Sequence, residues 1–321
     1  MKRVKGLLVF LSGCMIAAAC AAQDFPSKPI RLIVPFPAGG AVDTIARKLG
    51  NDLGQRLGTT VIVENKPGAS TIIGTDFVAK APADGYTLLL TAPAGIVQGP
   101  WLQKLPYDPL KDLTPVYLVA KVPTALLVPV SLQVNNYKDF VAYSKGNEGK
   151  MSYASLGNGS TAHIFGEMLS TKLAAKAVHV PYKGDAPAMV DLVSGRVQYI
   201  FNNVLTGINF SKQGRVKILA VTGDERLRVI PDVPTMRELG VSDFDIIGWY
   251  SLFAPAGLPR PVAEKIHAAV RESLRTPEFS EYMASVGVAA GNVSLDDFKK
   301  QVNIEYVKWG ELIKANNIHA D

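Results

Sequence analysis

Residues 30–47 read IRLIVPFPAGGAVDTIAR, and this stretch decides the fold. Ile30 to Val34 is an apolar run broken only by Arg31, which predicts a buried strand. The loop Pro35 to Gly40 follows. Beyond it, apolar residues recur at the three- and four-residue steps of an amphipathic helix: Val42, Ile45, Ala46, Leu49, Leu53 and Leu57. A buried strand that leads through a short loop into a helix is typical of an α/β fold.

The alternation continues through the first third of the chain. A strand is expected at residues 60–64, a helix at 72–80 and a third buried strand at 86–91. Strands that alternate with helices through short connections favour a sheet rich in parallel pairs, with helices on both faces.

The same plan starts again at residue 151. A short strand at 151–155 enters the loop Leu156 to Ser160, and a helix with apolar residues from Ile164 to Leu173 follows. A strand at 177–180, a helix from Asp185 to Gly195 and strands at 197–201 and 216–221 complete a second sheet. A mature chain of about 300 residues exceeds the usual size of a single core, so we expect two similar domains.

Two extended segments connect these domains. Val116 to Leu132 is apolar and contains two prolines, and Ile246 to Phe253 is a second crossing, followed by helices at 262–274, 277–286 and 295–315. The C-terminal third therefore returns to the first domain. We expect a first domain at 23–125 and 247–321, a second at 126–246, and a hinge at the crossings, where a few residues between elements absorb domain motion.

The N-terminus predicts an export signal over residues 1–22. Three basic residues precede an apolar run that ends in small residues, with cleavage after Ala21 or Ala22. A retained membrane anchor is the alternative, and Leu11 to Cys14 also resembles a lipoprotein box that would attach a lipid at Cys14. The expected location is the periplasm.

Both cysteines, Cys14 and Cys20, lie in this removable segment. Cleavage would leave no thiol for a disulfide, a metal site or a nucleophile. It would also remove three of the 34 basic residues and leave 31 against 28 acidic ones. Because there is no charge run and no basic-aromatic interleaving, we expect no nucleic-acid partner. The four histidines have no metal-binding spacing, and we expect no metal.

Two loops carry the expected chemistry. Gly39 and Gly40 permit close approach of the backbone, and the first N–H groups of the helix that follows have no intrahelical acceptor. Leu156 to Ser160 repeats the arrangement and adds side chains of Ser155, Asn158 and Ser160. Loops at the carboxyl ends of strands gather at one edge, so the pair predicts an anion site between the domains. A tight Gly-Gly turn, and Asp43 and Asp185 as simple helix-start residues, are the alternatives.

An enzyme is the less favoured hypothesis. Ser160, His163 and Asp185 are the residue types of a hydrolase triad, but a serine at a helix start is normally a cap. The chain has no G-x-S-x-G, G-x-G-x-x-G or phosphate-loop motif. Binding without catalysis is therefore expected.

The motifs also resemble a known family. Pro35 to Arg47 is similar to the signature of the tripartite tricarboxylate transporter receptors, also called Bug proteins. The resemblance covers nearly all of the mature chain, through Glu64 to Ala69, Asp84 to Leu89, Leu105 to Pro109, Tyr153 to His163, His179 to Gly184, Pro231 to Thr235 and Phe253 to Gly257.

The resemblance implies a two-domain periplasmic binding fold of type II that closes on a small carboxylate, as a monomer without cofactor. It implies delivery to membrane permease subunits; a membrane signalling partner is the alternative, which neighbouring genes would decide. The implied contacts are Ala38, Gly39, Gly40, Thr91, Ala92, Ser155, Asn158, Ser160, and His163 or Asp185 at the rim.

One position departs from the family pattern. After Val197, the strand ends in Asn202 and Asn203, where the family usually has an acidic residue. The loss of a carboxylate would remove repulsion of an anion, or an acceptor for a ligand amine, and would make an amino-acid ligand less expected. Selectivity is therefore expected from the wall at Asn202.

Overall fold

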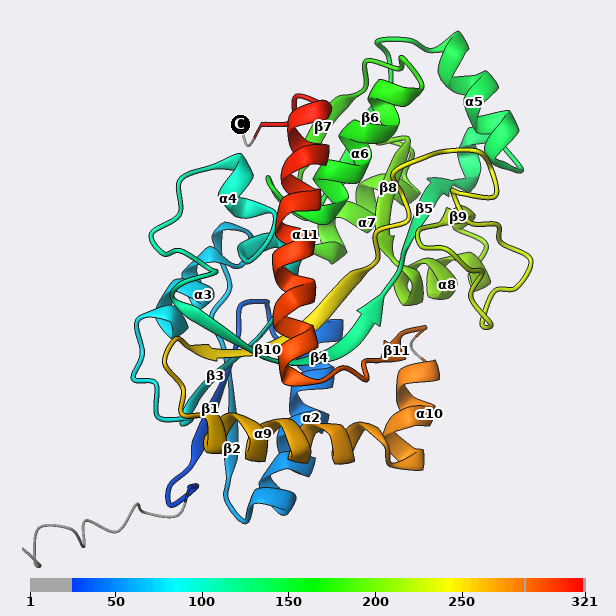
Figure 1. The fold of residues 1–321 in the computed structure, drawn as a ribbon. Helices are drawn as coiled ribbons and strands as arrows, with labels where there is room; N and C mark the ends of the chain where they lie inside the picture. Colours follow the sequence, from blue (N-terminus) through cyan, green and yellow to red (C-terminus); the bar gives the residue numbers. More distant parts are fainter. Residues whose placement is uncertain (1–24, 286, 320–321) are drawn as a thin grey trace, which may run out of the picture.

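The computed structural model describes residues 25–285 and 287–319. The predicted signal peptide at 1–22 and the candidate lipidation site Cys14 lie outside this part. The described chain forms two β-sheets with helices packed against them, and one long C-terminal helix runs along both (Figure 1).

The first sheet has six strands in the order β11-β4-β10-β3-β1-β2. The strand β1 pairs in parallel with β2 and β3, as predicted, whereas the other pairs of this sheet are antiparallel. Its strands are β1 (Ile30–Val34), β2 (Val61–Asn65), β3 (Thr87–Thr91), β4 (Leu113–Val122), β10 (Gly248–Pro255) and β11 (Ala289–Ala290).

Helices cover both faces of this sheet. Alternate residues of β1 divide between two apolar clusters: Ile30 and Leu32 pack with α2, and Ile33 packs on the other face with Val78 of α3. We call this sheet and its helices the first lobe: α2 (Ala41–Leu57), α3 (Ile72–Ala79), α4 (Gly99–Leu102), α9 (Arg260–Leu274), α10 (Pro277–Ser285) and α11 (Leu295–Ala315), with the short turns η1 (Ala69–Thr71) and η2 (Pro93–Gly95).

The second sheet has five strands in the order β7-β6-β8-β5-β9 and, with its helices, forms the second lobe. The strand β6 is parallel to β7 and β8, and β5 is antiparallel to β8 and β9. Both sheets are therefore mixed, because the crossing strands run against the βα units. The elements are β5 (Thr124–Pro129), η3 (Val130–Leu132), α5 (Tyr137–Gly146), β6 (Ser152–Ser155), α6 (Thr161–Lys172), β7 (Val178–Pro181), α7 (Asp185–Val193), β8 (Tyr199–Asn203), α8 (Val204–Lys212) and β9 (Val216–Val221).

Two neighbouring segments carry the chain between the lobes. The strand β4 ends at Val122 and β5 begins at Thr124, while Gly248 at the start of β10 pairs with Val122. The N–H of Thr222 donates to the carbonyl of Thr124 at 2.8 Å and ties the crossing to the end of β9.

The helix α11 also joins the lobes. Its Trp309 packs on Phe165 of α6, with ring centroids 5.7 Å apart, and the indole N–H of Trp101 in α4 donates to the carbonyl of Tyr306 at 2.8 Å. No helix in the described part of the chain is long and apolar enough to cross a membrane.

The strand registers place the carboxyl ends of the parallel strands at the boundary between the lobes. Thr124, where the chain enters the second lobe, pairs with Asn203 at the end of β8, so β6 and β7 also end there. In the first lobe Ser251, near the start of β10, pairs with Thr91 at the end of β3. The loops that follow these strands therefore face the same boundary, where open α/β sheets bind ligands.

Candidate functional site

The first predicted loop is braced by Asp43. The carboxylate of Asp43 is 3% exposed and accepts hydrogen bonds from the Gly39 N–H at 2.9 Å, Arg47 Nε at 3.0 Å and Asn65 Nδ2 at 2.9 Å. Asn65 Nδ2 also donates to the carbonyl of Phe36 at 3.1 Å. Burial opposes ionisation of Asp43, but the bonds from Arg47, Gly39 and Asn65 outweigh it and lower its pKa. Asp43 thus does more than start a helix: it holds the loop.

These hydrogen bonds to Asp43 determine which backbone N–H groups of the loop remain able to bind a ligand. The N–H of Gly39 is taken by Asp43, whereas Gly40 is the N-cap of α2 in an extended conformation and caps without a side chain. The N–H groups of Gly40 and Ala41 have no intrahelical acceptor. Ala38, Gly39 and Gly40 are exposed. The amides ready for an anion therefore begin at Gly40.

The second loop is held from beneath. Ser155 is buried, its hydroxyl shares a 2.6 Å hydrogen bond with His179 Nε2, and it accepts the Gly157 N–H at 3.2 Å. The Gly159 N–H donates to His163 Nδ1 at 3.1 Å. His163 is only 4% exposed, so it supports the loop from below instead of lying at the rim.

The residues of the hypothetical triad do not assemble into one. Ser160 Oγ accepts the backbone N–H of His163 at 3.3 Å and is the N-cap of α6. The carboxylate of Asp185 accepts from Asn202 and from Thr206. Within the described residues there is also no group of three or more His, Cys, Asp or Glu side chains that could hold a metal ion.

Direct hydrogen bonds join the lobes beside the predicted loops. Ser70 Oγ donates to the carbonyl of Asn158 at 2.6 Å, Gln98 Nε2 donates to Thr161 Oγ1 at 3.0 Å, and Asn203 Nδ2 lies 3.4 Å from the Tyr250 hydroxyl. Ser70 has a φ of 48°, between Ala69 at 45° and Thr71 at 81°. Three successive non-glycine residues in this region store backbone strain, which is common near functional sites.

Thr91 lies deeper than expected. Its side chain is fully buried opposite Ser251, and neither hydroxyl has a hydrogen-bond partner among the residues that the structure describes. Ala92 is partly exposed. A ligand at this strand end would therefore meet the backbone that follows Thr91 more readily than the Thr91 hydroxyl.

The wall at Asn202 retains a carboxylate. Asn202 is 2% exposed, and its Oδ1 accepts the Asn203 N–H at 2.7 Å, which turns its amide nitrogen toward Asp185. The strand end therefore carries amides, as the sequence shows, while Asp185 places a carboxylate beside Asn202. Burial raises the pKa of Tyr250, across the boundary, to about 12, and the charge of Asp185 adds to this.

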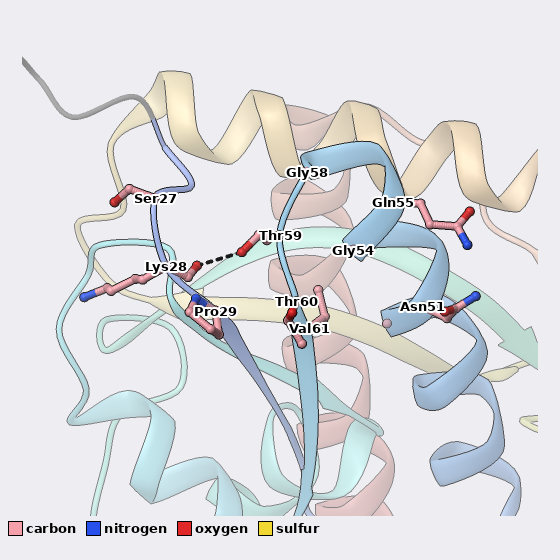
Figure 2. Close-up of a pocket in the computed structure, with 11 residues that line it drawn as sticks. Ser27, Lys28, Pro29, Asn51, Gly54, Gln55, Gly58, Thr59, Thr60 and Val61 are labelled. Atoms are coloured by element: carbon pink, nitrogen blue, oxygen red, sulfur yellow. Dashed lines mark hydrogen bonds between the residues drawn. The ribbon is translucent and has the colours of Figure 1, made fainter.

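Two surface hollows lie away from these loops. One of about 700 Å³ is formed by the end of α2 and the residues before β1 and β2, including Lys28, Gly54 and Thr59 (Figure 2). Another of about 740 Å³ lies against α3 and includes Arg31, Lys66 and Phe77. Neither contains a predicted site residue.

Two mixed sheets, joined by crossing strands and with their βα loops facing one boundary, define a two-lobed solute-binding protein of the periplasmic type. The chain belongs to the tripartite tricarboxylate transporter family receptors, whose family model matches residues 45–318. This confirms the resemblance and the fold class predicted from the sequence.

Named relatives agree with this assignment. The protein BugT of Bordetella pertussis is 33% identical over 308 residues, which cover 95% of this chain and 94% of BugT. An R. palustris protein solved with adipate is 32% identical, with a TM-score of 0.86 over 92% of this chain and 99% of its own. MatC from Rhodopseudomonas palustris, solved with bound malate, is 30% identical, with a TM-score of 0.83 over 90% and 100%.

Proposed function

We propose that this chain is a periplasmic receptor that captures a small carboxylate between its lobes and delivers it to the membrane permease of a tripartite transporter. The observation that carries the proposal is the pair of braced loops, 38–40 and 155–160, which follow strand ends at the same boundary. The adipate and malate bound by the two R. palustris relatives support a carboxylate as the ligand class.

The proposed site divides its residues by role. The backbone N–H groups from Gly40 onward would hold the carboxylate, since helix N-termini favour anions, and the loop Asn158 to Ser160 would face it from the second lobe. Asp43, Ser155 and His163 would hold these loops in place. Ala92 would contribute backbone, and Asp185 with Asn202 would form the opposite wall. Rotation about residues 122–124 and 247–248, where the chain crosses between the lobes, would open and close the site.

A ligand screen tests the proposal. The chain from residue 23 onward is melted with C3 to C8 mono- and dicarboxylates, malate and adipate included, and with their dimethyl esters as controls without the charge. A ligand at 100 times its Kd that binds only the folded state should add about 2.7 kcal/mol and raise the Tm by a few degrees. A screen in which no carboxylate raises the Tm above its ester would contradict the proposal.

Asp185→Asn is expected to strengthen the binding of malate or adipate about fivefold. Two like charges a few ångströms apart near water repel by roughly 1 kcal/mol, and the substitution removes one of them while it keeps a group of the same shape. Titration calorimetry measures the change. Asp232→Asn, which removes the same charge from an exposed loop, is the matched control and should leave the Kd unchanged. Equal affinities in wild type and Asp185→Asn would show that Asp185 does not lie close to the bound carboxylate.

A further inference from the structure

A stack of four rings supports the second loop. His163 of α6 lies against His179 of β7, with ring centroids 4.0 Å apart and an interplanar angle of 14°. Tyr153 of β6 stacks on the other face of His179 at 5.0 Å and 22°, and Tyr199 of β8 stacks on Tyr153 at 5.3 Å and 22°. The stack thus connects four elements of the second lobe to the loop that follows Ser155.

Both imidazoles hydrogen-bond to this loop. His163 Nδ1 accepts the Gly159 N–H, and an atom that accepts from an N–H cannot carry a proton itself. The observed loop therefore requires His163 to be neutral, with its proton on Nε2. On the other side of the loop, His179 Nε2 lies 2.6 Å from the Ser155 hydroxyl.

Protonation of His163 would break this arrangement. A proton on Nδ1 would point at the Gly159 N–H, so two donors would face each other and the loop from Gly157 to Ser160 would have to move. The stacked neighbour also resists charge, because two imidazolium rings 4.0 Å apart repel each other.

Glu167 is an ionisable group that contacts the stack through Tyr153. The Tyr153 hydroxyl donates to Glu167 Oε2 at 2.7 Å, and the Tyr199 hydroxyl donates to the carbonyl of Gly166 at 2.9 Å. The carboxylate of Glu167 would favour positive charge on either histidine. The loop geometry and the neighbouring ring therefore oppose protonation of His163, whereas Glu167 favours it. If His163 does bind a proton, the loop conformation is lost.

We propose that His163 and His179 are positioning residues that make ligand capture pH-dependent: the loop binds a carboxylate with His163 neutral and releases it when His163 takes a proton. The inference rests on the proposed function, because it assigns regulation to the same site. Since proton and ligand then compete, the affinity should fall by up to about tenfold per pH unit once the pH is low enough to protonate His163.

Isosteric variants separate this switch from a merely structural role. In His163→Asn the Oδ1 atom stands near the place of Nδ1, so it can accept the Gly159 N–H but cannot titrate. His179→Gln likewise places an amide group near the position of Nε2. His319→Asn, at an exposed histidine outside the lobes' boundary, is the matched control.

The readout is the Kd for malate and for adipate between pH 7.5 and 5.0, by calorimetry. Wild type and His319→Asn should lose affinity by tenfold or more across this range. Whatever its Kd at pH 7.5, His163→Asn should lose much less affinity than wild type on acidification. Protonation of the ligand itself cancels in the comparison, because every variant meets the same ligand. Parallel loss of affinity in wild type and His163→Asn would overturn the proposal.

A measurement without ligand makes the test independent of both the variants and the carboxylate. In ¹⁵N-labelled wild-type protein, the Gly159 amide resonance should shift in step with the titration of the His163 ring. A Gly159 resonance that stays in place while His163 titrates would also overturn the switch. Coupled titration in a protein that binds neither malate nor adipate would support the loop switch and count against the proposed carboxylate function.

Discussion

Gly40→Val is expected to abolish carboxylate binding, with an affinity loss above 100-fold, while the protein stays folded. Gly40 has φ −79° and ψ 172°, a conformation that valine adopts readily. A Cβ added there would meet only the Pro37 carbonyl, at 3.7 Å, which is an ordinary contact. The new side chain would therefore project into the space in front of the α2 amides, where the proposed carboxylate lies. Calorimetry with malate and adipate measures the loss, and circular dichroism measures the fold.

The control for this substitution must add the same side chain elsewhere. Gly146→Val, at the exposed end of α5, places a Cβ where nothing lies within 4 Å, and it should leave the Kd unchanged. Gly39 is unsuitable for this test because its φ of 84° would strain any other residue. A loss of binding could then come from a distorted loop as well as from a blocked site. A Gly40→Val protein that binds within threefold of wild type would show that the α2 amides do not hold the ligand.

Periodicity alone was enough to place most elements of this fold. The predicted strand at 30–34 and helix at 295–315 coincide with β1 and α11, because α11 is long enough to repeat its period and the short apolar run of β1 has the length of a strand. The helices α5 and α8 were not predicted. Their nine or ten residues carry few buried apolar side chains, although Asn136 caps α5 through the Asp139 N–H and was a usable local signal.

The candidate site was harder to predict than the fold. The two loops could be located, since glycine and serine between a strand and a helix are visible in the sequence. The sequence could not show which polar atoms of these loops remain available to a ligand, because the Gly39 amide and the Ser155 hydroxyl already hydrogen-bond to neighbouring residues. Contacts such as Ser70 with Asn158 join residues 88 apart, and no local pattern marks them.

Asp43→Ala is expected to weaken the protein and its proposed site together. The substitution removes a buried, charged acceptor that joins the Gly39 N–H and Asn65 Nδ2. The expected cost is about 2–4 kcal/mol of unfolding free energy, measured by urea denaturation. Little of this comes from Arg47, whose side chain is 53% exposed and returns to water. Because loop 35–40 loses its brace, the affinity for malate or adipate should fall at least tenfold.

The pH dependence of this effect identifies the carboxylate as its source. The folded-state pKa of Asp43 lies below the ordinary value of 3.8, so its ionised form stabilises the protein above about pH 4, and that contribution disappears as the pH falls through the lower folded value. The stability gap between wild type and Asp43→Asn should therefore be largest near neutrality and shrink below pH 4. Asp52→Ala, on the same helix, should change stability by less than about 0.5 kcal/mol. If Asp43→Ala lost no more unfolding free energy than Asp52→Ala, the prolines and glycines of the loop would be sufficient to fix its conformation. The position of Gly40 would then not depend on the side chain of Asp43.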